Sequence, residues 1–439
     1  MVDERQDRAK IFLSCLSLFL LTAAFIIAKT GRDALFFQGR GIFQLPLAYI
    51  MMGAAAVPLA VIFVKIMKVC GARPARVGVL IFAAAVMGFA APLLEAGDSL
   101  LLFNAFIFIP AIFGILFASL WLLASDIFEK TPKRQAARSF SKIGASSLAG
   151  GMAGGLAAKS IAPFVQSKWL ILISALVVVC VAALVTYMHR RFPSNIAGKK
   201  DQGTKNNSGF RAVLTNSYSL TLVFIAMSGA LVGLLIDFQF YVAAAGSNAN
   251  FFANFYILLN LGSLLLQLLA APQIQDKIGV RGGLMILPVA LIGGATFVTA
   301  AATALSRSVL RVTEGGLRSS IHRSLWEQAF IPLDSDHRSV AKIAADGIAA
   351  RIAEGIGATA IFLWLRQVAP GGITIAPLDT SWMAWVTLST VIVWLVITQR
   401  LRDQVKKDTG KAQTPAEDLD CVRFPDQCPC TTEMGKGVA

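Results

Sequence analysis

Charged residues are scarce in this sequence. Asp, Glu, Lys and Arg make up 15% of its 439 residues, whereas 56% are hydrophobic. A soluble protein carries roughly 25% charged residues and does not need repeated apolar runs of about 20 residues. The composition therefore predicts a polytopic membrane protein. The net charge of +15 does not require a nucleic-acid partner, because basic cytoplasmic loops alone give membrane proteins a positive charge.

Groups that usually perform hydrolytic or metal chemistry are scarce as well. The chain has three histidines, and no nucleophile–base pair or metal-ligand spacing emerges. Three of the six cysteines lie in or beside apolar segments, where free Cys behaves as a small hydrophobe. The other three, Cys421, Cys428 and Cys430, have no neighbouring histidine, which favours a plain tail over a zinc site. We expect neither an enzyme nor a bound metal or cofactor.

Twelve segments can be assigned as membrane spans, each needing about 20 apolar residues. They are 11–35, 44–68, 77–96, 99–125, 141–163 and 169–189, then 217–240, 249–272, 282–304, 306–330, 341–366 and 382–400. The polar, basic segment 190–216 between the two sets is typical of a flexible linker. We predict an all-α protein with six-helix halves at 1–189 and 217–400, and a disordered tail at 401–439.

Positive charge is concentrated at one end of the predicted helices. Lys and Arg cluster before residue 11, in the linker and after residue 399, whereas the loop 242–249 carries no charge. By the positive-inside rule, both termini and the linker are expected in the cytoplasm. A bacterial inner membrane is the expected location.

The two sets of spans resemble copies of one unit. Ser119-Leu120-Trp121 recurs 205 residues later as Ser324-Leu325-Trp326, and Asp33 has a counterpart 204 residues later in Asp237. A nearly constant shift across the chain indicates an internal repeat. Two parallel six-helix repeats joined by a linker describe the major facilitator architecture, in which the substrate site lies between the halves.

The copies differ most in the tenth predicted span. Its polar residues are spaced four, three, four and four apart, so they fall on one helical face; they are Arg307, Arg311, Glu314, Arg318 and His322. Their counterparts 205 residues earlier are Leu102, Phe106, Ile109, Phe113 and Phe117. One copy therefore has an apolar stripe where the other has a charged one.

Charges within a membrane helix normally face a water-filled cavity or one another. The excess of arginine in this span suits an anionic substrate, because guanidinium groups bind phosphate and carboxylate well. The alternative is that 306–330 is an amphipathic helix on the membrane surface.

The eleventh span adds three charges in an otherwise Ala-, Ile- and Gly-rich helix. Asp346, Arg351 and Glu354 replace small, uncharged residues of the first copy. They either contact the substrate or form an internal ion network.

Spans one and seven contribute further charges. Asp33 and Asp237 are repeat-related carboxylates that suit a coupling proton or ion, or pairing with Arg32 or with an arginine of the tenth span. The residues of the second copy that are equivalent to Lys29 and Arg32 are uncharged: Gly233 and Ile236. Both basic residues either join the substrate site or extend to the outer membrane interface.

Two stretches resemble the nucleotide transporter family, the ATP/ADP translocases of plastids and obligate intracellular bacteria. Lys29-Thr30-Gly31-Arg32-Asp33 resembles the family's Lys-Thr-x-basic-Asp segment, and Ser324-Leu325-Trp326 through Leu333, with Arg338 and Asp346, resembles its helix 10–11 region. The resemblance implies nucleotide exchange, with Lys29 and Arg32 gripping phosphates. The family's helix-eleven lysine aligns near Glu354, and its acidic residues in helices five and eight have no counterpart here, so the resemblance implies a divergent relative, either with the family's substrate or with another one.

These features predict a secondary active transporter that carries an anionic or phosphorylated solute, such as a nucleotide, by alternating access. The expected substrate-binding residues are Lys29, Arg32, Arg307, Arg311, Arg318 and Arg351, and the expected coupling residues are Asp33, Asp237, Glu314, Asp346 and Glu354. Other interpretations are a proton-coupled carrier of another organic solute, a membrane-embedded enzyme and a non-transporting relative. Exchange and symport are both compatible with the sequence, and we expect a monomer in the lipid bilayer.

Overall fold

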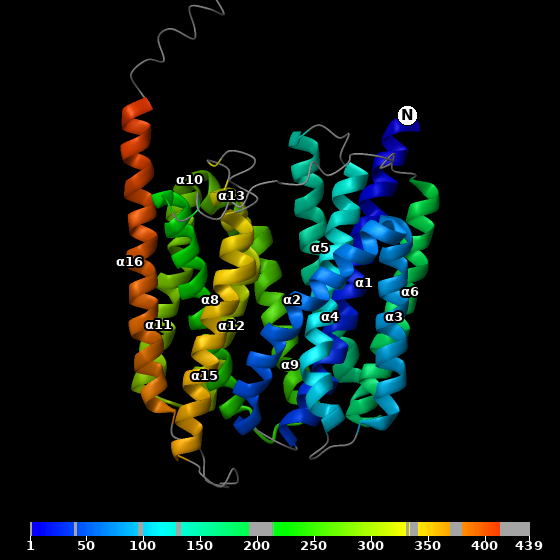
Figure 1. Ribbon diagram of the computed structural model, residues 1–439, viewed down its shortest axis with the longest axis horizontal. Helices are drawn as coiled ribbons and strands as arrows, with labels where there is room; N and C mark the ends of the chain where they lie inside the picture. The colour runs from blue at the N-terminus through cyan, green and yellow to red at the C-terminus, as the bar shows by residue number, and fades with distance from the viewer. Residues whose placement is uncertain are drawn as a thin grey trace, which may run out of the picture.

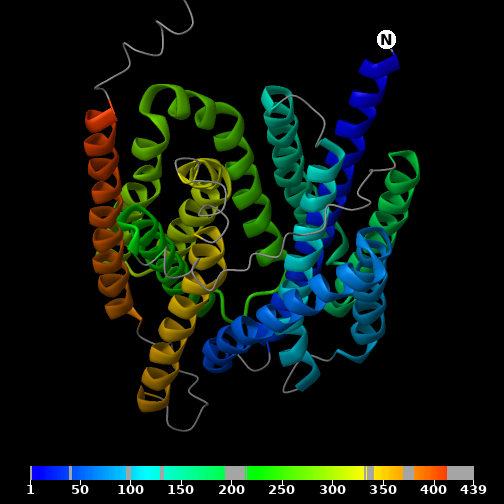
Figure 2. The ribbon, with the colours of Figure 1, turned by 45° about the horizontal axis from the view of Figure 1, so that its top comes forward.

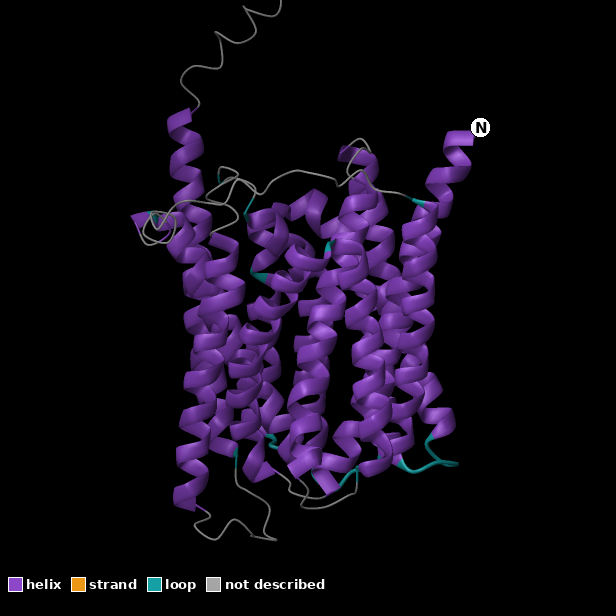
Figure 3. Cartoon of the chain, turned by 45° about the vertical axis from the view of Figure 1, so that its right-hand side comes forward, coloured by secondary structure: helices purple, strands orange, loops and turns teal. Residues whose placement is uncertain are grey.

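A computed structural model gives the fold of the chain. It describes residues 2–38, 42–94, 100–128, 133–192, 213, 215–330, 333, 341–368 and 380–412. Every regular element in this described part is a helix (Figure 3), which confirms the all-α class. Most of the predicted linker and tail, including the tail cysteines, lies outside the described residues.

The first part of the chain forms a series of long helices. They are α1 (Val2–Gln38), α2 (Leu45–Cys70), α3 (Ala72–Leu93), α4 (Leu100–Phe128), α5 (Lys133–Ile161) and α6 (Ser167–Arg191), with a 3-10 turn, η1 (Ile42–Gln44), before α2. Proline lies inside three of them, at Pro58, Pro92 and Pro110. Membrane helices tolerate such prolines because neighbouring groups satisfy the freed backbone atoms.

The helices of the second part are interrupted more often. They are α8 (Ser217–Ala243), α9 (Ala249–Leu265), α10 (Ala271–Leu284), α11 (Ile286–Ala300), α12 (Ala304–Leu317), α13 (Arg323–Ala329), α15 (Ala350–Val368) and α16 (Ser381–Ala412). Three π-helical turns join consecutive helices or begin one: η2 (Leu266–Ala270), η3 (Arg318–His322) and η4 (Ile343–Ala349). Side chains start α8 and α12: Asn216 accepts from the backbone N–H of Tyr218, and Thr303 and Ser306 form a capping box.

Every predicted span coincides with a helix, but the described residues contain nine helices that are long and apolar enough to cross a membrane. The other three spans fall on α2, α5 and α12. Glycine and serine replace many apolar residues in α5, and α12 carries the charged stripe, whereas α2 is apolar over Leu45–Ala55. Apolar length alone therefore does not establish twelve spans.

The helices form two groups that lie side by side (Figure 1). One contains α1 and α3–α6, and the other contains α8, α11, α12, α15 and α16; Figure 2 shows the same separation from another direction. Two helices make most of the contact between groups: α2 packs against α15, and α9 packs against α5 and α1. The start of α1 and the end of α16 lie at the same end of the bundle.

Glycines of α5 allow this helix to hold the two groups together. A Cβ at Gly154 would lie 2.5 Å from the carbonyl oxygen of Ala23 on α1, and a Cβ at Gly155 would lie 2.7 Å from the side chain of Ile257 on α9. The glycines one turn earlier repeat both approaches. Small residues four apart permit such close contact between helices in lipid, so α5 determines the spacing of α1 and α9.

The substitution Gly154→Ala is expected to lower the midpoint of thermal unfolding in detergent, because overpacking costs about 1–3 kcal/mol. Gly144→Ala is the matched control on the same helix, since a Cβ there has no heavy atom within 4 Å. Equal midpoints for the two variants would contradict the role of α5 as a spacer.

Candidate functional site

A buried ion pair on α1 is held by two tyrosines of the other group. Arg32 and Asp33 are 3% and 0% exposed, and Arg32 Nε donates to Asp33 Oδ1 at 2.7 Å. The second carboxylate oxygen, Oδ2, accepts hydrogen bonds from Tyr256 Oη at 2.5 Å and from Tyr241 Oη at 3.3 Å. Asp33 therefore links α1 to α9 and α8 across the boundary between the groups.

Aromatic rings reinforce this link. Phe37 stacks on Tyr241 with ring centroids 4.5 Å apart and on Phe252 at 6.0 Å. The guanidinium of Arg32 lies 4.2 Å from the centroid of Phe106. Phe37 and Tyr241 lie near the C-terminal ends of α1 and α8, and Phe106 and Phe252 lie near the starts of α4 and α9. The cluster therefore joins helix ends at the end of the bundle opposite the start of α1.

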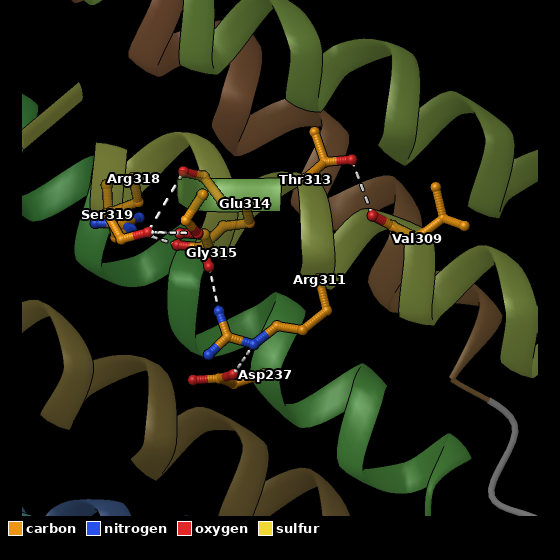
Figure 4. Close-up of polar contacts among 11 residues, drawn as sticks. Asp237, Val309, Arg311, Thr313, Glu314, Gly315, Arg318 and Ser319 are labelled. Atoms are coloured by element: carbon orange, nitrogen blue, oxygen red, sulfur yellow. Dashed lines mark hydrogen bonds and ion pairs between the residues drawn. The ribbon is translucent and has the colours of Figure 1, made fainter. Parts of the chain in front are cut away.

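A second ion network joins α8 to α12 (Figure 4). Arg311 Nε lies 2.5 Å from Asp237 Oδ1, and the same guanidinium pairs with Glu314, which also pairs with Arg318. Glu314 is 1% exposed, whereas the Arg318 side chain is 36% exposed. A buried charge is costly without a partner of opposite sign. In the order Asp237, Arg311, Glu314, Arg318 the charges alternate in sign, so each has such a partner.

Two glycines of α8 make room for Arg318. Its Nη2 donates to the carbonyl oxygen of Gly229 at 2.7 Å, and a Cβ at Gly233 would lie 3.3 Å from the same nitrogen. The ring of Trp394 lies 5.9 Å from the guanidinium carbon. The absence of side chains at these two positions therefore lets the guanidinium lie against the helix backbone.

Lys29 lies between the two networks. Its Nζ is 4.6 Å from the ring centroid of Tyr256 and 6.0 Å from that of Phe25. Its electrostatic neighbours include both signs: Asp33, Arg311, Arg32 and Asp237. Within the described part of the chain, no carboxylate forms a salt bridge with Lys29. This ammonium is therefore a cation without a direct counter-ion.

The remaining predicted residues lie further out. Arg351 donates to Glu354 at 2.6 Å on α15, and Glu354 interacts at longer range with Arg318 and Asp237. Arg307, one turn before Arg311, is 9% exposed.

Asp346 is separate from these networks. It accepts a hydrogen bond from Trp326 Nε1 at 2.9 Å, and the charged groups around it are Lys342, Glu327 and Arg323. The structure thus brings together seven predicted residues: Lys29, Arg32, Asp33, Asp237, Arg311, Glu314 and Arg318.

Three tyrosines complete the site and were not predicted from the sequence. Tyr241 and Tyr256 bind Asp33, and Tyr49 on α2 interacts electrostatically with Asp237 and Arg311. The chain has five tyrosines in total, so their scarcity was the available signal. A tyrosine in a membrane span needs a partner for its hydroxyl, and Asp33 provides it for Tyr241 and Tyr256.

The tenth predicted span lies inside the bundle and not on a membrane surface. α12 packs against α8, α9 and α11, and a Cβ at Gly315 would lie 2.8 Å from Leu259 of α9. The π turn η3 then changes the phase of the helix after Leu317. His322 consequently stacks with Trp326, at 6.1 Å between ring centroids, and does not extend the charged row.

Equivalent positions of the two repeats carry opposite chemistry. Phe113 packs against Phe25 with ring centroids 5.2 Å apart. The repeat equivalents of these residues are Arg318 and Gly229, which are also in contact. The equivalent of Lys29 is Gly233, which faces the Arg318 guanidinium. Among these equivalent positions, each group thus supplies one cation. Lys29 comes from α1 in one group, and Arg318 directly follows α12 in the other.

Comparisons with known proteins give one family match and a structural similarity. Residues 279–405 match the TLC ATP/ADP transporter family. This segment contains all of α12 and α15 and most of α16, and the match supports the resemblance noted in the sequence. No curated protein sequence matches the chain.

The fold is similar to that of the nucleoside transporter NupG. The TM-score is 0.61 at 12% identity, over 89% of this chain and 98% of NupG. A point mutant of NupG gives a TM-score of 0.62 at 14% identity, over 90% and 99% of the two chains. The similarity to these structures confirms the predicted all-α helix bundle, and the family match over residues 279–405 agrees with the predicted transport function.

The substitution Tyr256→Phe is expected to loosen the closed end of the bundle. A hydrogen bond to a charged group contributes about 1.5–3 kcal/mol, so local opening should become about tenfold more frequent or more. Hydrogen–deuterium exchange at the start of α9 measures this opening.

Tyr218→Phe is the matched control, because the Tyr218 hydroxyl donates to the carbonyl oxygen of Ala329, at 2.6 Å, within the second group. Unchanged exchange in α9 of the Tyr256→Phe protein would show that the hydrogen bond does not hold the groups together.

Proposed function

We propose that the protein is a secondary active transporter that carries an anionic, phosphorylated solute such as a nucleotide. The name of the matched family supports a nucleotide substrate, and that of NupG, a nucleoside transporter, supports the nucleoside part of such a solute. Two six-helix halves, 1–189 and 217–400, would move against each other by alternating access, joined by the linker 190–216 and followed by the tail 401–439.

The observation that carries the proposal is the position of Lys29 against the other half. Its ammonium lies 4.6 Å from the ring centroid of Tyr256 and forms no salt bridge with a carboxylate of the described residues, which leaves it available to an anion. An anion bound by Lys29 and by Arg311 of α12 would contact both halves at once. A solute at that position matches the midplane site that alternating access requires.

The carboxylates act as counter-ions of the empty carrier in this proposal. Asp237 and Glu314 neutralise Arg311 and Arg318 when no solute is bound. A phosphate group competes with them because it also pairs with guanidinium. Asp33 stabilises the closed end through its tyrosines, so it couples closure to the site.

Other predicted residues support this core. Arg32 holds Asp33, Arg307 adds positive charge one turn from Arg311, and the Arg351–Glu354 pair faces the network from α15. Asp346 is not assigned to coupling, because its hydrogen bond to Trp326 places it apart.

We place the protein in a cell membrane, a bacterial inner membrane by default, as a monomer. The start of α1 and the end of α16 share one end of the bundle, which agrees with both termini being cytoplasmic. The Asp33–Tyr256 link then closes the outer side.

A proton-coupled carrier of another organic anion is the second candidate. The Asp237 side chain is 23% exposed and pairs with Arg311. When Arg311 binds a solute instead, the Asp237 carboxylate loses its counter-ion and takes up a proton.

Counterflow in proteoliposomes tests the proposal. Vesicles loaded with ATP should accumulate labelled ADP, whereas empty and phosphate-loaded vesicles should not. Accumulation that instead follows a proton gradient in empty vesicles would favour the second candidate.

The substitution Lys29→Gln is expected to reduce ADP counterflow by roughly tenfold or more, because it removes one charge-assisted contact of about 1.5–3 kcal/mol. Lys168→Gln is the matched control: the Lys168 ammonium also lies over an aromatic ring, Trp169 at 5.8 Å, but at an exposed end of α6. Normal counterflow by Lys29→Gln would remove Lys29 from the substrate site.

A further inference from the structure

An aromatic pair lies beside Lys29 on the first half. Phe25 on α1 and Phe117 on α4 meet edge to face, with ring centroids 5.8 Å apart and planes at 87°. Both side chains are half-buried, whereas Phe113 behind them is fully buried. Phe113 therefore supports the pair, and the two rings keep part of their surface uncovered.

The uncovered surface of Phe25 lies beside Lys29. α1 is surrounded by α4, α5, α6 and α9, so little of this part of the helix can reach lipid. Phe25 lies one turn from Lys29 on the same helical face. The Lys29 ammonium is shared between the rings of Phe25 and Tyr256, which come from different halves. Phe25 is consequently next to the proposed anion site.

The two counterpart positions in the second half offer no equivalent aromatic surface. The repeat counterparts of Phe25 and Phe117 are Gly229 and His322. Gly229 is covered by Arg318, and His322 packs between the indoles of Trp326 and Trp394. The region between the halves therefore has an aromatic side and a cationic side.

We infer that Phe25 and Phe117 form a stacking subsite for a flat ring of the substrate, whose anionic end binds Lys29, Arg311 and Arg318. This inference rests on the proposed function and deepens it. The chemical class is a phosphorylated nucleoside, because such a molecule has a planar ring at one end and phosphate at the other. Simple phosphates and small dicarboxylates lack the ring and would use only the cationic side.

Binding to the full-length protein in lipid nanodiscs tests this inference, with ADP and inorganic pyrophosphate as the probes. Phe25→Leu and Phe117→Leu should each weaken ADP binding by about tenfold, near the lower end of what a base–aromatic stack contributes, and should change pyrophosphate binding by less than about twofold. Phe25→Trp should retain ADP binding, because it keeps an aromatic face. Phe164→Leu is the matched control, since Phe164 is 85% exposed.

Each outcome decides the inference. Selective loss of ADP binding, in variants that unfold at the wild-type temperature, supports the ring subsite. Equal weakening for ADP and pyrophosphate, or equal affinity of the wild-type protein for both probes, overturns it and leaves the anion site standing. Failure of the wild-type protein to bind either probe overturns the proposed function together with the inference.

Discussion

The need to neutralise buried charge constrains the structure of this helix bundle. Arg311 and Glu314 lie in the interior of the helix bundle, where an unpaired charge is far more costly than in water. Arg311 therefore needs Asp237 of α8, and Glu314 needs Arg318 of the next turn. These pairings fix how α12 is rotated and how closely it approaches α8. The glycines of α8 follow from the same requirement, because a side chain there would displace Arg318.

The two halves place their charged residues at different positions, and this difference makes the site asymmetric. In the first half the aromatic ring of Phe113 fills the position that Arg318 occupies in the second. Charge is provided instead by Lys29, at a position where the second half has Gly233. Residues at equivalent positions thus give the first half an aromatic pair beside a lysine and the second half a row of arginines. An asymmetric solute then has one preferred orientation.

Much of the fold could be predicted from the sequence because apolar length and repeat spacing are strong, local signals. The helices lie where the apolar runs lie, and the shift between copies pairs the correct positions, as the contacts of Phe25 with Phe113 and of Gly229 with Arg318 illustrate. The charged stripe was predictable for the same reason, since charges in a membrane helix are rare. Of the alternatives that the sequence left open, Asp33 takes Arg32 and Asp237 takes Arg311.

The rest depends on contacts between distant segments and has no periodic signature. Tyr256 donates a hydrogen bond to Asp33, 223 residues away in the sequence. The residues around Tyr256 do not indicate that its hydroxyl has this partner. The π turn at Arg318–His322 could not be foreseen either, so His322 was expected on the charged face but packs between tryptophans. Asp346 looked equivalent to the network residues because composition alone cannot show that its partner is Trp326.

The most direct test of the central claim is a cryo-electron microscopy structure of the protein in lipid nanodiscs with ADP bound. The account predicts phosphate density in contact with the Lys29 ammonium and with the guanidinium of Arg311 or Arg318, and a weakened Asp237–Arg311 pair. Phosphate density elsewhere, with that ion pair unchanged and Lys29 still unpaired, would contradict it.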